Sequence, residues 1–136
     1  MRLDTKVSAT QLAGRKVLVI DDDPQSLKLT ARMLRSAGYE VVTRSEVFGT
    51  SFAVASERPN VVLIDLNMPA LDGDRLAPLI QRSVPNPPPI VLYSGLSEKV
   101  LRERALACGA SATIPKGLAP ELFLERIAQV FNRLSS

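Results

Sequence analysis

The chain has 136 residues, 46% of them hydrophobic and 23% charged, and these values suit one soluble globular domain with its own core. A net charge of +3, an aromatic content of 4% and the lack of a dense basic run give no sign of nucleic-acid binding. Cys108 is the single cysteine, which excludes an intrachain disulfide, and the absence of histidine excludes Ser-His-Asp catalysis and the commonest zinc sites.

The first predicted elements follow a polar stretch. Residues 1–15 are polar and irregular, so we expect a flexible N-terminal extension followed by a domain over residues 16–136. A strand over Val17–Ile20 leads into Asp23-Pro24, a pair that suits the N-cap and first turn of a helix. Gly38 is a typical stop for that helix.

Four further pairs of strand and helix are predicted along the chain. The strands are expected at 41–42, 61–64, 90–93 and 112–114, and the helices at 47–56, 74–82, after Ser97 as far as Gly109, and from Pro120 onward. The proline-rich run 85–89 is interpreted as a connector rather than a ligand for another domain. Cys108 is interpreted as a small buried apolar side chain, with a nucleophilic role as the alternative.

The alternation of strand and helix predicts the fold class. Five such repeats indicate an α/β protein whose parallel sheet carries helices on both faces. The strands read as continuous apolar runs, as expected when a strand is buried on both sides. Right-handed crossovers then give an open, doubly wound five-stranded sheet.

Polar side chains follow the ends of four of the predicted strands. Parallel strands end at the same edge of a sheet, where ligands of such folds bind, so we expect these side chains to gather there. They are Asp21 and Asp22 after the first strand, Asp65 and then Asn67 after the third, Ser94 after the fourth and Lys116 after the fifth.

This set of side chains suits phosphoryl chemistry. Three carboxylates close together repel one another, and a divalent cation such as Mg²⁺ (or Mn²⁺) relieves that repulsion. A carboxylate can also act as a nucleophile and form an aspartyl phosphate. Lys116 and the hydroxyl of Ser94 are suited to hold the phosphoryl oxygens. We therefore predict phosphoryl transfer to one of these carboxylates, beside a divalent metal that the carboxylates hold.

Several runs resemble the receiver domain of two-component response regulators. The similarity covers about residues 16–134, and it implies a flavodoxin-like sheet with strand order 2-1-3-4-5. Among receivers, the chain is similar to the stand-alone, single-domain type of the chemotaxis response regulator. An end at Ser136, after the last helix, fits that expectation. The matching runs are VLVIDDDP at 17–24, VLIDLNMP at 62–69, LDG at 71–73, SG at 94–95 and IPK at 114–116.

The resemblance implies a role for each site residue. Asp65 matches the phosphoacceptor and also contacts the metal, while Ser94 and Lys116 match the hydroxyl and the lysine that act on the phosphoryl group. For the metal site, Asp22 matches the direct ligand, Asp21 the acid that often acts through water, and Asn67 the residue whose backbone carbonyl completes the coordination.

The resemblance also implies the partners. A histidine kinase or a phosphotransfer protein would supply the phosphoryl group, and a downstream effector protein would bind the fourth helix, fifth strand and fifth helix. The chain would catalyse only its own phosphoryl transfer and dephosphorylation, with no direct DNA binding. No apolar run has the length of a signal peptide or membrane span, so we expect a cytoplasmic protein without membrane insertion. Homodimerisation stays open.

Three positions depart from the family pattern. Gly117 follows the lysine where the family usually has proline, so no cis peptide is expected there. Thr113 replaces the aromatic residue that often swings inward with the hydroxyl. Leu96 is apolar where polar residues often assist the dephosphorylating water, which predicts slow hydrolysis of the phosphoryl group. A phosphorylation-independent scaffold is therefore the alternative. A Mg²⁺-dependent phosphatase fits poorly, because Asn67 stands where such enzymes generally have a second acid.

Overall fold

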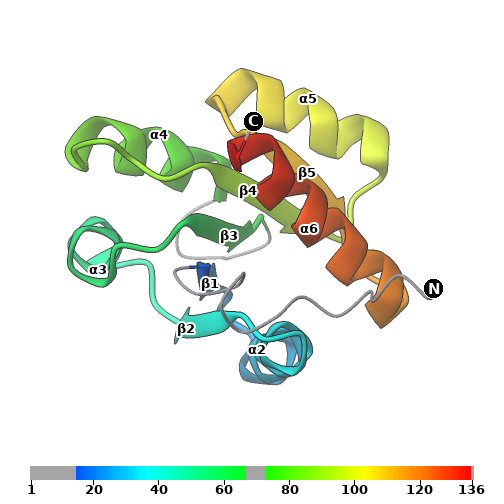
Figure 1. Ribbon diagram of the computed structural model, residues 1–136. Helices are drawn as coiled ribbons and strands as arrows, with labels where there is room; N and C mark the ends of the chain where they lie inside the picture. Colours follow the sequence, from blue (N-terminus) through cyan, green and yellow to red (C-terminus); the bar gives the residue numbers. More distant parts are fainter. Residues whose placement is uncertain (1–14, 67–72, 136) are drawn as a thin grey trace.

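Strands and helices alternate along the chain in the computed structural model, which describes residues 15–66 and 73–135 (Figure 1). The strands are β1 (Lys16–Ile20), β2 (Glu40–Arg44), β3 (Val61–Asp65), β4 (Ile90–Ser94) and β5 (Ala112–Pro115). The helices are α2 (Pro24–Ser36), α3 (Thr50–Glu57), α4 (Gly73–Ser83), α5 (Glu98–Cys108) and α6 (Pro120–Ser135).

The five strands form one parallel sheet in the order β2-β1-β3-β4-β5. This confirms the predicted doubly wound fold and its strand order. The central strands β3 and β4 are buried along their whole length, which accounts for their continuous apolar sequences. The outer strand β5 ends in Pro115, which is tolerated because an edge position needs fewer ladder hydrogen bonds.

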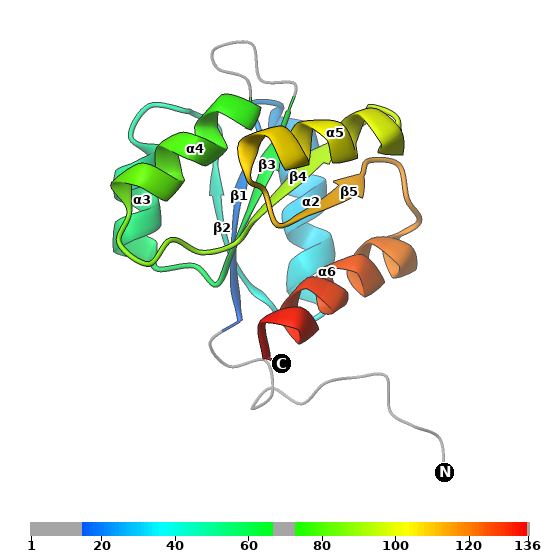
Figure 2. The same cartoon turned by 90° about the horizontal axis from the view of Figure 1, so that it is seen from above.

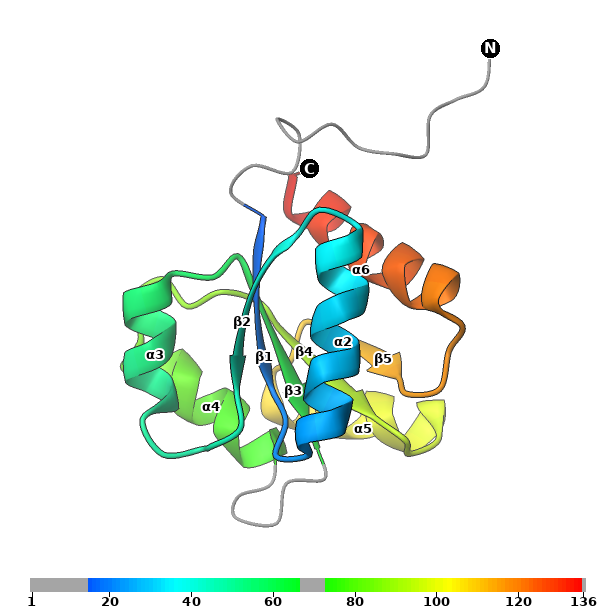
Figure 3. The ribbon, with the colours of Figure 1, turned by 90° about the horizontal axis from the view of Figure 1, so that it is seen from below.

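Helices cover both faces of the sheet and create two core layers (Figures 2 and 3). Successive side chains of a strand point to opposite faces, so Val17 and Val19 pack towards α2 and α6, while Leu18 and Ile20 pack towards α3, α4 and α5. The layer of α2 and α6 holds aromatic side chains, among them Tyr39 stacked on Phe131 at 5.2 Å between ring centroids. The other layer is aliphatic and includes Cys108, which is buried as predicted.

Local sequence signals determine where most helices begin and end. Asp23 caps α2 by accepting a hydrogen bond from the backbone N–H of Gln25. Ser97 caps α5, and Gly109 ends it in the left-handed conformation with φ of +80°. The helix predicted over 47–56 instead begins at Thr50, because the left-handed backbone of Gly49 (φ +80°) cannot belong to a right-handed helix.

The predicted N-terminal extension and the expectation of no membrane span are compared with the described residues as follows. Residues 1–14, which make up nearly all of the predicted extension, lie outside the described residues. Across 15–66 and 73–135, none of the helices combines the length and the apolar character that a membrane crossing requires.

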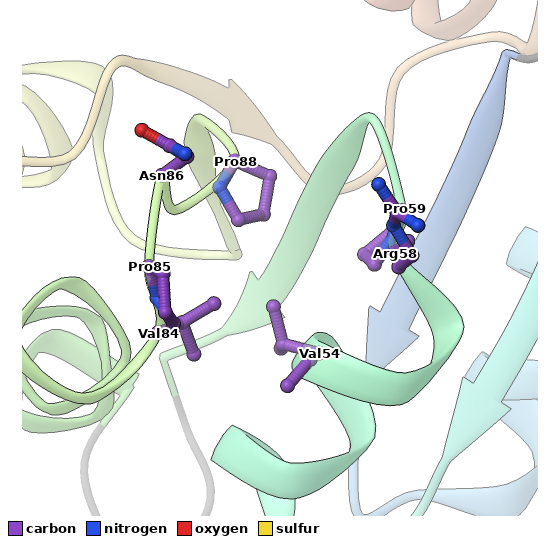
Figure 4. A pocket seen from close by; sticks show the side chains of 8 residues that line it. Val54, Arg58, Pro59, Val84, Pro85, Asn86 and Pro88 are labelled. Atoms are coloured by element: carbon purple, nitrogen blue, oxygen red, sulfur yellow. The ribbon is translucent and has the colours of Figure 1, made fainter.

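A cavity of about 510 Å³ lies at the amino ends of β3 and β4 (Figure 4). Val54 of α3 and the proline-rich run line it, together with Arg58. The carboxyl ends of the strands, where the acids are, lie at the opposite edge of the sheet. The cavity therefore contributes none of its lining residues to the predicted site, and the run 85–89 joins α4 to β4.

Candidate functional site

Four strands carry polar side chains to a single point at the carboxyl edge of the sheet. The ammonium of Lys116, directly after β5, lies 3.3 Å from a carboxylate oxygen of Asp21 and 3.3 Å from one of Asp65. The side chains of Asp21 and Asp65 are only 1% and 5% exposed. The structure therefore brings together predicted site residues that are far apart in the sequence.

The three predicted acids form a cluster that suits a divalent cation. Asp21, Asp22 and Asp65 each offer a carboxylate oxygen, and these oxygens lie within 4.8 Å of one another. Asp21 and Asp65 are buried, whereas Asp22 is exposed. One lysine balances only part of this negative charge, and oxygen ligands in such a group are what Mg²⁺ prefers. Asn67, the fourth predicted ligand, lies outside the described residues.

The start of α2 fixes the position of Asp21. Its backbone N–H donates to the carbonyl of Arg44 at 3.1 Å, and its carboxylate accepts from the backbone N–H of Asp23 at 3.0 Å. Burial by itself would raise the pKa of Asp21. Hydrogen bonds from Ser26 and Asp23, together with the charge of Lys116, outweigh burial and lower the pKa below its usual value. Asp21 is therefore held as a carboxylate.

Lys116 is held as a cation at the centre of the site. Its backbone N–H donates to the carbonyl of Ser94 at 2.7 Å, which anchors the residue at the end of β4. Burial would lower the pKa of Lys116, but the nearby carboxylates of Asp65 and Asp21 outweigh burial and raise the pKa. The ammonium also lies over the ring of Tyr93, 5.3 Å from its centroid, where the face of the ring attracts a cation.

Ser94 lies at the end of β4, one strand away from Asp65. Its side chain is buried, and its hydroxyl oxygen accepts a hydrogen bond from the backbone N–H of Leu96 at 3.2 Å. The space beside Gly95 is open, because no heavy atom lies within 4 Å of the place where a Cβ would stand. A small group bound at Asp65 would therefore meet no side chain at this position.

Two residues of the site were not predicted from the sequence. Ser26 in the first turn of α2 lies 3.3 Å from the ammonium of Lys116, and Tyr93 contacts the same lysine through its ring. The sequence contains a signal for Ser26. It lies in the first turn of the helix that follows Asp21 and Asp22, so it must lie at the same carboxyl edge of the sheet. Tyr93 was predicted only as the last residue of a strand, and its contact with Lys116 depends on the pairing of β4 with β5.

The departures from the family pattern are visible in the structure. Thr113 lies in β5, partly buried, and its backbone carbonyl accepts from the guanidinium of Arg126 at 3.1 Å. Gly117 has φ of +90°, and the described residues contain no cis peptide bond. The loop after Lys116 therefore runs through a conformation that proline, with φ near −65°, cannot adopt.

Comparison with known proteins agrees with this geometry. The family model described as "Response regulator receiver domain" matches residues 17–128. The transcriptional regulatory protein PrrA of Mycobacterium tuberculosis is 31% identical over 127 residues, 93% of this chain and 54% of that protein. The transcriptional regulatory protein KdpE of the same species is 36% identical over 117 residues, 86% of this chain and 51% of that protein. The chain thus spans about half the length of these curated relatives.

Solved structures give the same result. The chemotaxis protein CheY4 of Vibrio cholerae superposes with a TM-score of 0.75 at 26% identity, covering 85% of this chain and 97% of that one. A CheY-like receiver domain protein of Methanospirillum hungatei gives a TM-score of 0.77 at 25% identity, covering 88% and 94%. With the matched residues 17–128, these likenesses show that the chain belongs to the response regulator receiver domain family.

Proposed function

We propose that this chain accepts a phosphoryl group on Asp65 from a histidine kinase or a phosphotransfer protein, in a reaction that depends on Mg²⁺. The observation that supports this most directly is the contact of Lys116 with the buried carboxylate of Asp65, 3.3 Å away, inside a cluster of three acids. A carboxylate oxygen of Asp65 would attack phosphorus while the bond from phosphorus to the donor's imidazole nitrogen breaks.

The other residues of the site have complementary roles in this proposal. Lys116 would leave its contact with the Asp65 carboxylate in part and pair with a phosphoryl oxygen. Ser94 would offer its hydroxyl to another oxygen, in the open space beside Gly95. Asp21, Asp22, Asp65 and the carbonyl of Asn67 would hold the cation, which when bound neutralises charge on the phosphoryl oxygens. Residues 16–136 would form the domain.

The proposed output is binding of a downstream effector when Asp65 is phosphorylated. The curated relatives PrrA and KdpE are named transcriptional regulatory proteins, and this chain matches about half of each. The family's usual readout surface corresponds to α5, β5 and α6. In this proposal the chain is a signalling acceptor that catalyses only its own phosphoryl transfer and dephosphorylation.

Labelling with a small-molecule phosphodonor tests the acceptor. With acetyl phosphate and Mg²⁺, we expect the chain to gain one phosphoryl group by intact-mass spectrometry and the Asp65→Asn variant to gain none. Asp23→Asn is the matched control, because it makes the same change at the same edge and asparagine still caps α2. Equal labelling of Asp65→Asn and the unchanged chain would exclude Asp65 as the acceptor.

A phosphorylation-independent scaffold is the second candidate, and Thr113 is the observation that favours it. A threonine in β5 has no ring to bury when the hydroxyl of Ser94 engages a phosphoryl group. Partner binding should be measured with and without beryllofluoride, which mimics a phosphoryl group on aspartate. Equal affinity in both conditions would favour the scaffold, and an increase with beryllofluoride would favour the phosphorylation-dependent output.

A further inference from the structure

The helices α3 and α4 carry large apolar side chains on their outer side. Phe48, just before α3, and Phe52, in its first turn, have rings that lie largely in water, and Leu79 of α4 is also exposed. The two helices lie side by side, with the hydroxyl oxygens of Ser51 and Ser83 2.7 Å apart (Figures 2 and 3). Leu79 lies one turn before Ser83 on the same side of α4. Exposed apolar side chains gathered in this way mark an interaction site.

The cavity of about 510 Å³ in Figure 4 continues this apolar surface. Ala55, which lines the cavity, follows Phe52 by three residues and therefore lies on the same side of α3. Val84 and Pro85, directly after α4, form another wall, and Val54 lies between the walls (Figure 4). The volume is within the range of binding pockets, and its proline walls are stiff. We call these exposed helix sides and the cavity the α3–α4 face.

Three arginines place positive charge around the α3–α4 face. Arg75, Leu79 and Arg82 recur at helical spacing, so both guanidinium groups lie on the side of α4 that carries Leu79. Arg58, at the end of α3, lines the cavity. All three arginines are exposed, and within residues 15–66 and 73–135 their side chains form no hydrogen bond or ion pair. Glu57, the neighbour of Arg58, pairs with a lysine of β1 instead.

Charge and shape together select the occupant of this face. A second copy of the chain that presented the same face would bring its arginines against these, which opposes pairing. A flat membrane surface would not fill a hollow of this volume. A helix of another protein meets both requirements, because apolar side chains on successive turns can enter the cavity and cover Phe52 while acidic side chains reach the arginines.

We propose that the α3–α4 face binds an amphipathic helix of a partner protein in which apolar side chains on successive turns are flanked by Asp or Glu. One apolar side chain would fill the cavity beside Val54, and the next would cover the ring of Phe52. The flanking carboxylates would pair with Arg58 and Arg82. The face includes no residue of the acid cluster or of α5, β5 and α6, so the inference goes beyond the proposed function and does not rest on it.

Anisotropy of labelled peptides tests this face on the whole chain without any phosphodonor. The probe is a short synthetic helix with two leucines four residues apart among glutamates, compared with the same peptide carrying lysines in place of the glutamates. We expect the glutamate peptide to bind roughly tenfold or more tightly than the lysine peptide. Amide NMR shifts on titration should map to α3, α4 and the residues around the cavity.

Three variants locate the binding, each on an exposed position so that circular dichroism should be unchanged. Phe52→Ser should weaken binding of the glutamate peptide roughly tenfold, whereas Leu29→Ser, at an exposed leucine of α2 on the other face of the sheet, should not. Arg58→Glu should weaken binding, and Arg32→Glu on α2 is its matched control. Ala55→Glu places a negative charge at the cavity and should abolish binding of the glutamate peptide.

Several results would overturn the inference. Equal binding of the two peptides, no binding of the glutamate peptide, or NMR shifts confined to α5, β5 and α6 would each exclude the α3–α4 face as its site. Three rival occupants would each replace the proposed one: vesicles of phosphatidylserine and phosphatidylcholine that sediment the chain, an oligonucleotide that displaces the peptide, or a dimer that Phe52→Ser dissociates. Asp65→Asn should bind the peptide normally, so a failure of phosphoryl labelling and a failure of this face are separate results.

Discussion

Two regions of the molecule depart from the usual distribution of polar and apolar residues: one buries polar side chains, and the other exposes apolar ones. At the carboxyl edge of the sheet, Asp21, Asp65 and Ser94 are buried. At the start of α3, Phe48 and Phe52 are 90% and 78% exposed. Burying a charge is expensive unless it is paired, whereas exposing a ring costs much less. The two regions should therefore differ greatly in how much a substitution changes stability.

The reason for the difference lies in the contacts of each region. The buried acids depend on Lys116 and on backbone donors, so each group there is fixed by others. The turn before α3 is fixed without its aromatic rings, because Arg44 donates to the carbonyl of Phe48 and Gly49 supplies the left-handed conformation. Removing an exposed ring from α3 should therefore cost little stability. Removing a charge from the carboxyl edge should cost more, because it leaves buried partner groups without a counter-charge.

Within the two compared regions, the largest effect is expected from Lys116→Met. This variant keeps most of the side-chain volume but leaves Asp21 and Asp65 buried without their cation, so the free energy of unfolding should fall by about 2–3 kcal/mol. Chemical denaturation without added metal measures it. Lys99→Met, on the exposed side of α5, is the matched control and should change stability very little. Equal loss in both variants would show that the ion pairs contribute no more than an exposed lysine.

Divalent metal should change stability next most strongly. If Mg²⁺ binds the folded acids, saturation to about one hundred times its Kd should stabilise the fold by about 2.7 kcal/mol. Thermal unfolding in Mg²⁺ and in a chelator measures this shift. Asp22→Asn should reduce it, because the exposed acid is a predicted ligand with few structural contacts. A shift that is the same in Asp22→Asn would place the metal elsewhere.

Alkaline pH should destabilise the fold through the two tyrosines of the chain, both of which lie in the core. Burial raises the pKa of Tyr39 and of Tyr93 above the usual value near 10. The folded state then holds more protons than the unfolded state above about pH 10, so stability falls as pH rises through that range and is unaffected below it. Tyrosinate absorbance should therefore appear together with loss of circular dichroism. Ionisation of both rings in a still-folded chain would contradict their burial.

The smallest effect on the free energy of unfolding is expected at the exposed rings near the start of α3. Phe52→Ser should change the free energy of unfolding by no more than about 0.5 kcal/mol, because the ring is largely in water already. Phe123→Ser, on the buried face of α6, is the contrasting substitution from the core and should cost at least about 3 kcal/mol. A large loss in Phe52→Ser would mean that its ring makes contacts that its exposure conceals.

The sequence predicted most of the fold and the identity of the buried acids. Periodicity alone gives the alternation of strand and helix, and the rule that parallel strands end at one edge places Asp21, Asp65, Ser94 and Lys116 together. The start of α3 was wrong by three residues, because the left-handed turn at Gly49 overrides the helical spacing of Phe48 and Phe52. The exposure of those rings was not predictable, since four-residue spacing is equally typical of a core face.

The additional contacts of Lys116 in the site depend on tertiary structure. Ser26 and Tyr93 touch Lys116 because α2 and β4 both lie beside the end of β5. The position of Ser26 in the first turn after Asp21 and Asp22 places it at this edge, whereas no short-range pattern encodes the contact of Tyr93. The role of Asn67 stays a prediction, as does the assignment of residues 1–15 to an extension.

The positive φ of Gly117 determines which parts of this protein are interchangeable with those of its relatives. A proline at that position would need a φ of the opposite sign, so the chain cannot acquire the family's usual Lys-Pro pair by a single exchange. A chimera would have to carry the whole connection from the end of β5 to Pro120. For protein engineering, the unit of transfer here is therefore the loop rather than the residue.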